Sequence, residues 1–170
     1  IDGANVDTID VYCAYFAYVT NKTDDTVSVI DTTNNTGFGD VIPVGEGPDA
    51  LAIKPDGSKV YVTNSDSDSV SVIDTATNTV VYTIDSGFAN PRGIDVSPDG
   101  TQIYVSNHDS NYVCVYDVTG DPVKVGDNIV LAYGLPLGLA FKPPNGDKVY
   151  VATYHGPPVA QYASVIDTAT

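Results

Sequence analysis

The chain has 170 residues and a formal net charge of −15 at pH 7, and its 22 acidic side chains are all aspartates except Glu46. Seven scattered basic residues do not make the basic face that phosphate binding needs, so we expect no nucleic-acid partner. The longest apolar run, residues 129–141, is too short to cross a bilayer as a helix, which predicts no membrane span in this chain.

Short sequence blocks recur in a fixed order along the chain, and each block predicts one or two β-strands. In chain order they are YVTN (18–21), VSVID (27–31), LAIKPDGSKVYVTN (51–64), VSVID (70–74), IDVSPDGTQIYVSN (94–107), VCVYD (113–117), LAFKPPNGDKVYVAT (139–153) and ASVID (163–167). Apolar residues recur at every second position and β-branched residues dominate, which is typical of strands. The tyrosines at 18, 61, 104 and 150 stand 43, 43 and 46 residues apart.

Turn residues join these predicted strands into one repeated unit. Pro-Asp-Gly at 55–57 and at 98–100 predicts the turn from the first strand to the second, since proline fixes φ and glycine accepts a positive φ. A fourth strand is expected at 79–84. Antiparallel four-stranded units without helices predict an all-β fold, a β-propeller of four-stranded blades. We expect one domain over residues 1–170, with units near 1–47, 48–90, 91–135 and 136–170.

The YVTN blocks, the Pro-Asp-Gly turn before them and the VSVIDTATN passage after them resemble the YVTN family of β-propeller repeats. The resemblance covers about residues 15–170 and implies a surface-layer or secreted protein, commonly of seven blades. It implies no single activity, because related propellers, including lactonase-like and quinoprotein-dehydrogenase-like ones, share the blade and differ in their loops.

The two ends of the chain look like complementary halves of one blade. Residues 1–6 resemble the end of a third strand, and residue 170 stands where a fourth strand would begin. We therefore expect the N-terminal strand to complete the last blade, because closure removes the exposed edge of a sheet. Closure within the chain as a four-bladed ring, strand exchange with a second chain and blades absent from this sequence are the alternatives. Residues 6–13 are either an inner or an outer strand.

The polar loop after each second strand is a candidate cation site. Asp66 and Asp68 lie two residues apart, as oxygen ligands do in calcium loops, but the loop lacks the required glycine and the bidentate glutamate. The corresponding loop one unit later carries His108 and Asp109. We expect hairpin turns and no cofactor here, with weak calcium binding by these four residues as the alternative.

Other positions predict modification or partner binding. Asn21 and Asn34 open glycosylation sequons in turn-rich stretches. Cys13 and Cys114 form either a disulfide, a pair of buried thiols or a link between chains, and the sequence leaves these alternatives open. The loop with Tyr154 and His155 differs most in sequence from the corresponding loops of the other units, so it is the candidate loop for partner binding.

Residues that recur in every unit are expected to be structural, because an active site is a single asymmetric set. We expect the aspartates that end the third strands to cap turns and the recurring tyrosines to pack between blades. The aspartates are Asp31, Asp74, Asp117 and Asp167, and the tyrosines are Tyr18, Tyr61, Tyr104 and Tyr150.

The sequence thus predicts a non-catalytic extracellular or cell-surface protein, a structural or protein- or glycan-binding module that can self-associate, including into filaments. The alternative is an enzyme or cofactor-binding propeller, lactonase-like or quinoprotein-dehydrogenase-like, with a site in the central channel. Such an enzyme should carry non-repeating His, Asp or Arg residues at equivalent ends of the inner strands. Arg92 and Asp95 are the only signs of such a set that the repeat pattern singles out.

Overall fold

The computed structural model describes residues 16–132, 134–154 and 162–168, which form four antiparallel sheets, named A to D in chain order. Sheet A contains β1 (Phe16–Asn21), β2 (Thr26–Asp31), β3 (Thr36–Gly37) and β4 (Ile42–Pro43). Sheet B contains β5 (Pro48–Ile53), β6 (Lys59–Asn64), β7 (Ser69–Asp74) and β8 (Thr79–Ile84). Sheet C contains β9 (Pro91–Val96), β10 (Gln102–Asn107), β11 (Tyr112–Asp117), β12 (Val123–Lys124) and β13 (Ile129–Val130), with a short 3-10 helix, η1 (His108–Ser110), after β10. Sheet D contains β14 (Leu135–Phe141), β15 (Lys148–Tyr154) and β16 (Tyr162–Asp167).

Sheet B is the complete example of the repeat, with its strands in the order β5-β6-β7-β8. The β6 and β7 strands pair from Lys59↔Asp74 to Asn64↔Ser69, and the β10–β11 and β15–β16 pairs repeat this register. The predicted repeat of antiparallel strands is therefore confirmed. Over the residues described, no helix is long and apolar enough to cross a bilayer.

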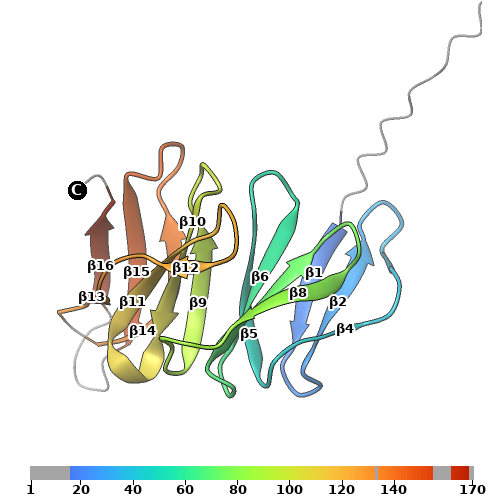
Figure 1. Cartoon of the computed structure of the whole chain (residues 1–170), viewed down its shortest axis with the longest axis horizontal. Helices are drawn as coiled ribbons and strands as arrows, with labels where there is room; N and C mark the ends of the chain where they lie inside the picture. Colours follow the sequence, from blue (N-terminus) through green and yellow to red (C-terminus); the bar gives the residue numbers. More distant parts are fainter. Residues whose placement is uncertain (1–15, 133, 155–161, 169–170) are drawn as a thin grey trace, which may run out of the picture.

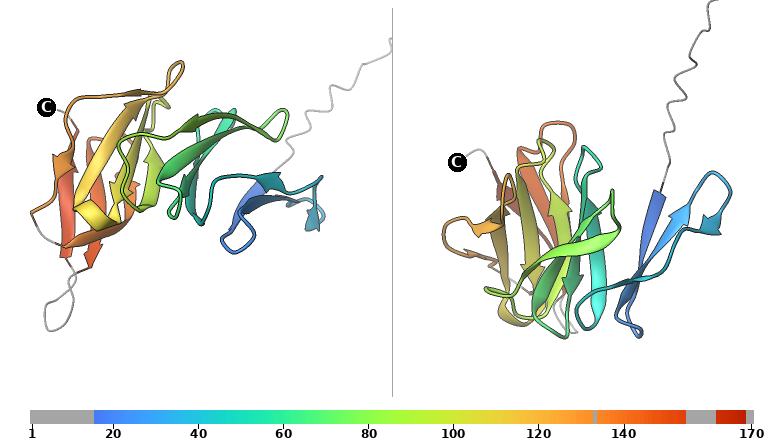
Figure 2. Two further views of the ribbon diagram at one scale, coloured as in Figure 1. Left: turned by 60° about the horizontal axis from the view of Figure 1, so that its bottom comes forward. Right: turned by 45° about the vertical axis from the view of Figure 1, so that its right-hand side comes forward.

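The four sheets stand side by side in chain order, and sheets A and D lie at opposite ends of the row (Figures 1 and 2). A four-bladed ring would require sheet D to pack against sheet A, but sheets B and C separate them. The described residues therefore do not form the closed ring that one alternative required. Completion of the last blade by the N-terminal strand falls outside the described residues and stays a prediction.

Alternate side chains of each strand point toward opposite neighbouring sheets, so one strand contributes to two cores. We call the face toward the next sheet in chain order the forward face, and the opposite one the backward face. Val60 and Val62 on β6 point backward and pack with Val27 of sheet A, whereas Tyr61 points forward into a core with Val105 of sheet C. A third core joins sheets C and D in the same way. Both faces of sheets B and C are consequently buried.

The recurring tyrosines follow this arrangement, with one exception. Tyr61 and Tyr104 are 2% and 6% exposed between sheets, as predicted. The half-buried Tyr18 donates its hydroxyl to Asn78 Oδ1 across the junction of sheets A and B, at 2.9 Å. Tyr150 is 44% exposed, so the prediction of packing between blades is wrong for this residue. The reason is that the described part of the chain sets no sheet in front of sheet D.

Three of the four aspartates at the ends of the third strands, Asp31, Asp74 and Asp117, cap the following turns as predicted, whereas the cap by Asp167 stays a prediction. Asp31 Oδ1 accepts the Thr33 backbone N–H at 2.8 Å, and Asp117 Oδ1 accepts the Thr119 N–H at 2.9 Å and the Thr119 hydroxyl at 2.6 Å. The hydroxyl bond, followed by the backbone bond, lowers the pKa of Asp117. A carboxylate that is hydrogen-bonded in the folded chain stabilises it only while ionised.

The inner strands of sheets C and D lie close together at Gly93. A Cβ atom at this position would lie 2.4 Å from the Leu137 carbonyl oxygen and 2.9 Å from the Gly138 Cα atom. Both are backbone atoms, which cannot move aside as the end of a flexible side chain can. The spacing of β9 and β14 therefore depends on the absence of a side chain at residue 93.

We expect Gly93→Ala to lower the free energy of unfolding by about 1–3 kcal/mol, the usual cost of overpacking a tight site. Urea unfolding followed by circular dichroism measures this change. Gly120→Ala is the matched control, because a Cβ atom there meets nothing within 4 Å. Equal effects of the two substitutions would contradict the close approach of β9 and β14.

The Asp117 turn predicts a pH-dependent difference between the wild type and Asp117→Asn. The folded-state pKa is lowered, so the wild type should be the more stable chain above the unfolded pKa near 3.8. This advantage should disappear as the pH falls through the lowered folded-state pKa. Urea midpoints from pH 7 to pH 2 test the expectation. Asp127→Asn, in an exposed loop, removes the same charge elsewhere on the surface and is the matched control.

Candidate functional site

A row of charged side chains lies where the inner strands of sheets B and C begin. Pro48 and Pro91 open β5 and β9, so Asp49 and Arg92 occupy equivalent positions one sheet apart. Asp49 Oδ2 lies 3.5 Å from Arg92 Nη1 and 3.6 Å from Nζ of Lys22, which comes from the β1–β2 loop. The repeat pattern singled out Arg92 and missed Asp49, although aligning the two prolines gives them one position. These are non-repeating charges at equivalent inner-strand ends.

The row continues to two of the predicted cation ligands. Arg92 Nε donates to Asn90 Oδ1 at 3.3 Å, and Asn90 Nδ2 donates to Asp109 Oδ2 at 3.3 Å. Asp109 Oδ1 lies 2.8 Å from His108 Nδ1, and this bond, followed by the one from Asn90, lowers the pKa of Asp109. Exposed ion pairs of this kind contribute only about 0–1 kcal/mol, so the row mainly orients the loops.

Of the other two predicted ligands, Asp68 joins two loops and Asp66 bonds within its own loop. Asp68, with a φ of 48°, accepts the backbone N–H of Asn90 on Oδ1 at 2.6 Å. Asp25 makes the equivalent bond one sheet earlier, to the Gly47 N–H at 2.8 Å. Asp66 Oδ1 accepts the Ser65 hydroxyl at 3.2 Å. Within the described ranges, no group of three or more His, Cys, Asp and Glu side chains could hold a metal ion.

Hydroxyl groups at the third position of the YVTN block also join consecutive sheets. The hydroxyls of Thr20, Thr63 and Ser106 donate to the carbonyl oxygens of Asp49, Arg92 and Leu137, respectively. Each bond runs from β1, β6 or β10 to the inner strand of the next sheet. In sheet D the equivalent residue is Ala152, which has no hydroxyl. The recurring threonine of the motif therefore has a structural role.

The remaining predicted site residues lie apart from one another. The Asn21 amide nitrogen donates to the hydroxyls of Thr26 at 3.0 Å and Ser28 at 2.8 Å, whereas Asn34 lies in an exposed turn. Glycosylation of both stays a prediction. Cys114 is buried, with its thiol 2.9 Å from the Gly87 carbonyl oxygen. Its proposed partner Cys13 lies outside the described residues, so the disulfide stays a prediction. Tyr154 is exposed at the end of β15, and His155 also lies outside the described residues.

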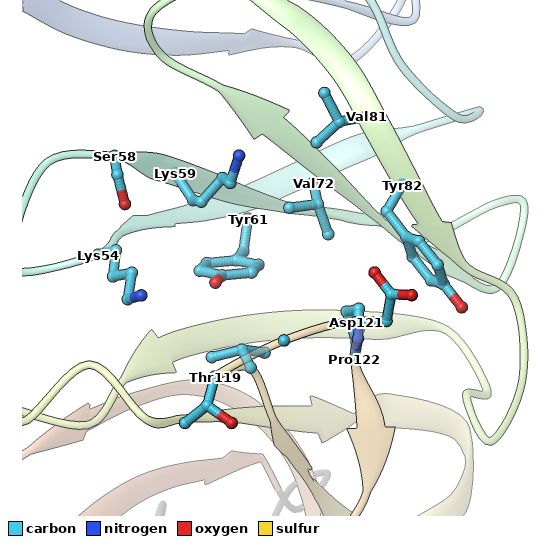
Figure 3. Close-up of a pocket in the computed structure, with 12 residues that line it drawn as sticks. Lys54, Ser58, Lys59, Tyr61, Val72, Val81, Tyr82, Thr119, Asp121 and Pro122 are labelled. Atoms are coloured by element: carbon cyan, nitrogen blue, oxygen red, sulfur yellow. The ribbon is translucent and has the colours of Figure 1, made fainter.

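A cleft of about 350 Å³ opens between the forward face of sheet B and the loop that follows β11 of sheet C (Figure 3). The residues that line it are Lys54, Ser58, Lys59, Tyr61, Val72, Val81, Tyr82, Val118, Thr119, Gly120, Asp121 and Pro122. In Figure 3, Lys54 and Asp121 flank Tyr61 from opposite sides, and Tyr82 lies beyond Asp121. This cleft combines apolar walls with a few polar groups, as ligand sites commonly do.

Tyr61 is the buried polar group of the cleft. Its side chain is 2% exposed, and its hydroxyl makes no hydrogen bond within the described part of the chain. Burial, followed by the charge of Asp56, raises the pKa of Tyr61 to about 12, so the hydroxyl stays protonated at neutral pH. The hydroxyl oxygen itself is accessible from the cleft, so it can donate its proton to a ligand there.

The other polar groups of the cleft differ in whether they form ion pairs with neighbouring side chains. Lys59 Nζ is held by Asp74 Oδ2 at 2.6 Å, and Lys54 Nζ lies 3.5 Å from Asp56 Oδ2. The exposed Asp121 carboxylate makes no hydrogen bond or ion pair to any described residue. The cleft thus offers a hydroxyl, an ammonium group and a carboxylate beside apolar surface.

Sequence reasoning missed this cleft because its walls come from different sheets. A signal was nevertheless present. The turn after Asp117 reads Val-Thr-Gly-Asp-Pro, where the turn after Asp74 reads Thr-Ala-Thr-Asn-Thr. The departure from the repeat brings Asp121 and Pro122 to the junction of sheets B and C.

Comparisons with known proteins agree with the described fold. A family model described as "YNCE-like beta-propeller" matches residues 4–138. A solved structure titled "Kuenenia stuttgartiensis Hydrazine Synthase" is similar with a TM-score of 0.83 and 29% identity over 91% of this chain, which spans 43% of that chain. A search of curated proteins found no match. The predicted β-propeller fold is confirmed.

The bonds made by Asp66, Asp68 and Asp109 predict that these loops form without calcium. We expect the thermal midpoint of the purified chain to stay within about 1 °C when EDTA replaces calcium, because a ligand that binds only the folded state raises its stability. Differential scanning calorimetry measures the midpoint. A drop of many degrees that calcium reverses would identify these side chains as ligands.

Proposed function

The chain belongs to the YNCE-like β-propeller family, and we propose that it acts as a non-catalytic binding module built from YVTN-type repeats. The proposed location is a cell surface or the extracellular medium. The high density of aspartate in surface turns and the exposed sequon at Asn34 support this location. The proposed partner is a glycan, with a protein segment as the second choice.

The proposal rests mainly on the difference between polar residues that recur in every unit and residues that occur in one unit only. The recurring polar residues bond one sheet to the next or cap turns, as Thr63 and Asp117 do. Three residues without counterparts in other units, Tyr82, Asp121 and Pro122, line one end of the cleft beside the recurring Tyr61. An open and partly apolar site with residues that occur in one unit only is suited to binding a ligand.

The polar groups of the cleft suit a ligand rich in hydroxyl groups. The Tyr61 hydroxyl and the Lys54 ammonium group can donate to sugar oxygens, and the Asp121 carboxylate can accept from sugar hydroxyls. Tyr82 is 40% exposed and offers an aromatic face to the apolar side of a sugar ring. A purely anionic ligand is less well matched, because Asp56 and Asp74 contact the two lysines and Asp121 adds a further carboxylate to the cleft.

An enzyme is the second candidate function, and two observations favour it. One is the similarity to the chain titled hydrazine synthase. The other is the non-repeating pair of Asp49 and Arg92 at equivalent inner-strand ends. We rank this function second because Asp49 contacts both Arg92 and Lys22, so its carboxylate is already engaged by cations.

Calorimetric titration with neutral and N-acetylated tetrasaccharides tests the binding proposal. We expect at least one of them to bind with a Kd near or below about 1 mM, typical of a small exposed site. Tyr61→Phe removes only the hydroxyl and Asp121→Ala only the carboxylate, and each should weaken binding about tenfold, or about 1.4 kcal/mol.

Asp127→Ala is the matched control, because Asp127 is an exposed aspartate in the same segment that does not line the cleft. Its affinity should equal that of the wild type. Absence of binding across the panel would reject a glycan partner for this cleft. Turnover of a bound sugar, followed by mass spectrometry, would favour the enzyme instead.

A further inference from the structure

β8 is the outer strand of sheet B, and its outer edge is unpaired. The strand pairs with β7 from Asp74↔Thr79 to Val70↔Ile84, and no other described strand pairs with it. We propose that this edge binds an extended basic segment of a partner protein by strand addition, with a lysine or arginine side chain in the groove beside Asp40. This second binding site uses none of the polar groups of the cleft.

The edge of β8 is longer and less protected than the corresponding edges of sheets A and C. Those sheets break their outer strands into two-residue pieces, β3 with β4 and β12 with β13. β4 ends in Pro43 and β12 ends in Lys124, and proline and lysine on an edge hinder pairing with another chain. β8 runs over six residues, TVVYTI, without a proline or a charge. Its outer backbone groups are therefore open to an added strand.

The side chains of β8 are those of a strand that has neighbours. Val81 is 52% and Tyr82 40% exposed, although β-branched and aromatic residues favour packed strands (Figure 3). The pairing with β7 is irregular at Val81, and both Val81 and Tyr82 line the cleft. A strand added at the edge would set its own side chains beside these two and cover them in part.

A groove of about 460 Å³ lies beside the first half of β8, between the outer strands of sheets A and B. Residues 39–43 and 77–80 line it. Val80 packs on the core between sheets A and B, so the groove lies on the backward side of β8. Side chains alternate along a strand, so a strand paired with β8 directs every second side chain toward this side.

The groove suits a side chain that has an apolar stem and a positively charged end. Val41, which is 53% exposed, and the half-buried Val80 provide apolar surface. Asp40 is exposed, and its carboxylate makes no hydrogen bond or ion pair to any described residue. Lysine and arginine lay their stems along apolar surface and keep their charged ends in a polar environment. Either residue therefore matches the groove and its carboxylate.

The charges around β8 favour a basic partner over other occupants. Asp40 lies near the Thr79 end, and the exposed Asp85 directly follows the other end. Antiparallel pairing of β8 with β8 of a second copy would bring these carboxylates of the two chains toward each other, and like charges repel. The residues outside the described ranges contain no lysine or arginine, so they do not supply the basic side chain. The net charge of −15 also attracts a basic segment.

Fluorescence anisotropy with labelled eight-residue peptides tests the proposal. The peptides alternate lysine or arginine with valine, isoleucine or threonine, and a matched panel carries glutamate in place of the basic residues. We expect at least one basic peptide to bind the chain with a Kd near or below about 100 µM, and the glutamate peptides to bind at least about tenfold more weakly. Added salt should weaken binding, since it screens the attraction.

Variants of the chain test the location of the site. Asp40→Asn should weaken binding of the basic peptide about fivefold, as loss of an exposed ion pair can. Asp127→Asn, in an exposed loop, is its matched control. Val81→Lys should weaken binding about tenfold, because it sets a like charge beside the added strand. Val123→Lys, on the exposed β12, is the control for that change, and both controls should bind like the wild type.

Peptides that are N-methylated at alternate residues test strand addition on the wild-type chain. One pattern methylates the amides that face β8 and the other methylates those that face away, while side chains and charge stay the same. Strand addition predicts a loss of about tenfold for one pattern only. Hydrogen exchange at residues 79–84 should also slow when the basic peptide is bound.

Absence of binding across the basic panel, or equal binding of both methylated patterns and the parent peptide, would overturn the proposal. Self-association of the chain that Val81→Lys abolishes, seen by native mass spectrometry, would overturn it in favour of a second copy. Tyr61→Phe should leave peptide binding unchanged, and Asp40→Asn should leave glycan binding unchanged. Failure of one site is therefore distinguishable from failure of the other.

Discussion

Burial of both faces of a sheet is the constraint on which this structure depends. Val60 and Val62 need a neighbour on one side of β6, and Tyr61 needs another on the opposite side. One sheet cannot satisfy both, since its strands alternate apolar side chains between two faces. Stacking consecutive sheets solves the problem for sheets B and C. Hydrogen bonds such as that of Thr63 to the Arg92 carbonyl then align each sheet with the next.

The strands and turns of this fold follow from local chemistry, so the sequence predicted them well. The alternation around Tyr61 is visible in the letters, and the capping role of Asp117 involves residues only two apart. Tyr150 shows where such reasoning fails. Its sequence surroundings repeat those of Tyr61, but its exposure is decided by whether another sheet stands in front of it. A repeated sequence motif does not indicate whether a neighbouring sheet covers the residue.

The candidate site was harder to predict for the same reason. Asp121 and Tyr61 line the same cleft only because sheets B and C pack together, and no sequence motif indicates this. Asp49 and Arg92 lie one unit apart and pair because β5 and β9 stand side by side. The predicted cation ligands were correctly located in the loops, but their oxygens serve neighbouring backbone and side-chain groups. Asp68, which binds the Asn90 N–H, is the clearest example.

The equivalence of forward and backward positions has an evolutionary consequence. A sheet that is inserted by duplication meets its neighbours through the side chains that those neighbours already used, so no new interface has to be invented. Deletion of one unit likewise leaves two matching surfaces to meet. Genes that encode such a row can therefore gain or lose a module in a single event without loss of foldability. Sequence change is then free to act on the loops, such as the one that holds Asp121.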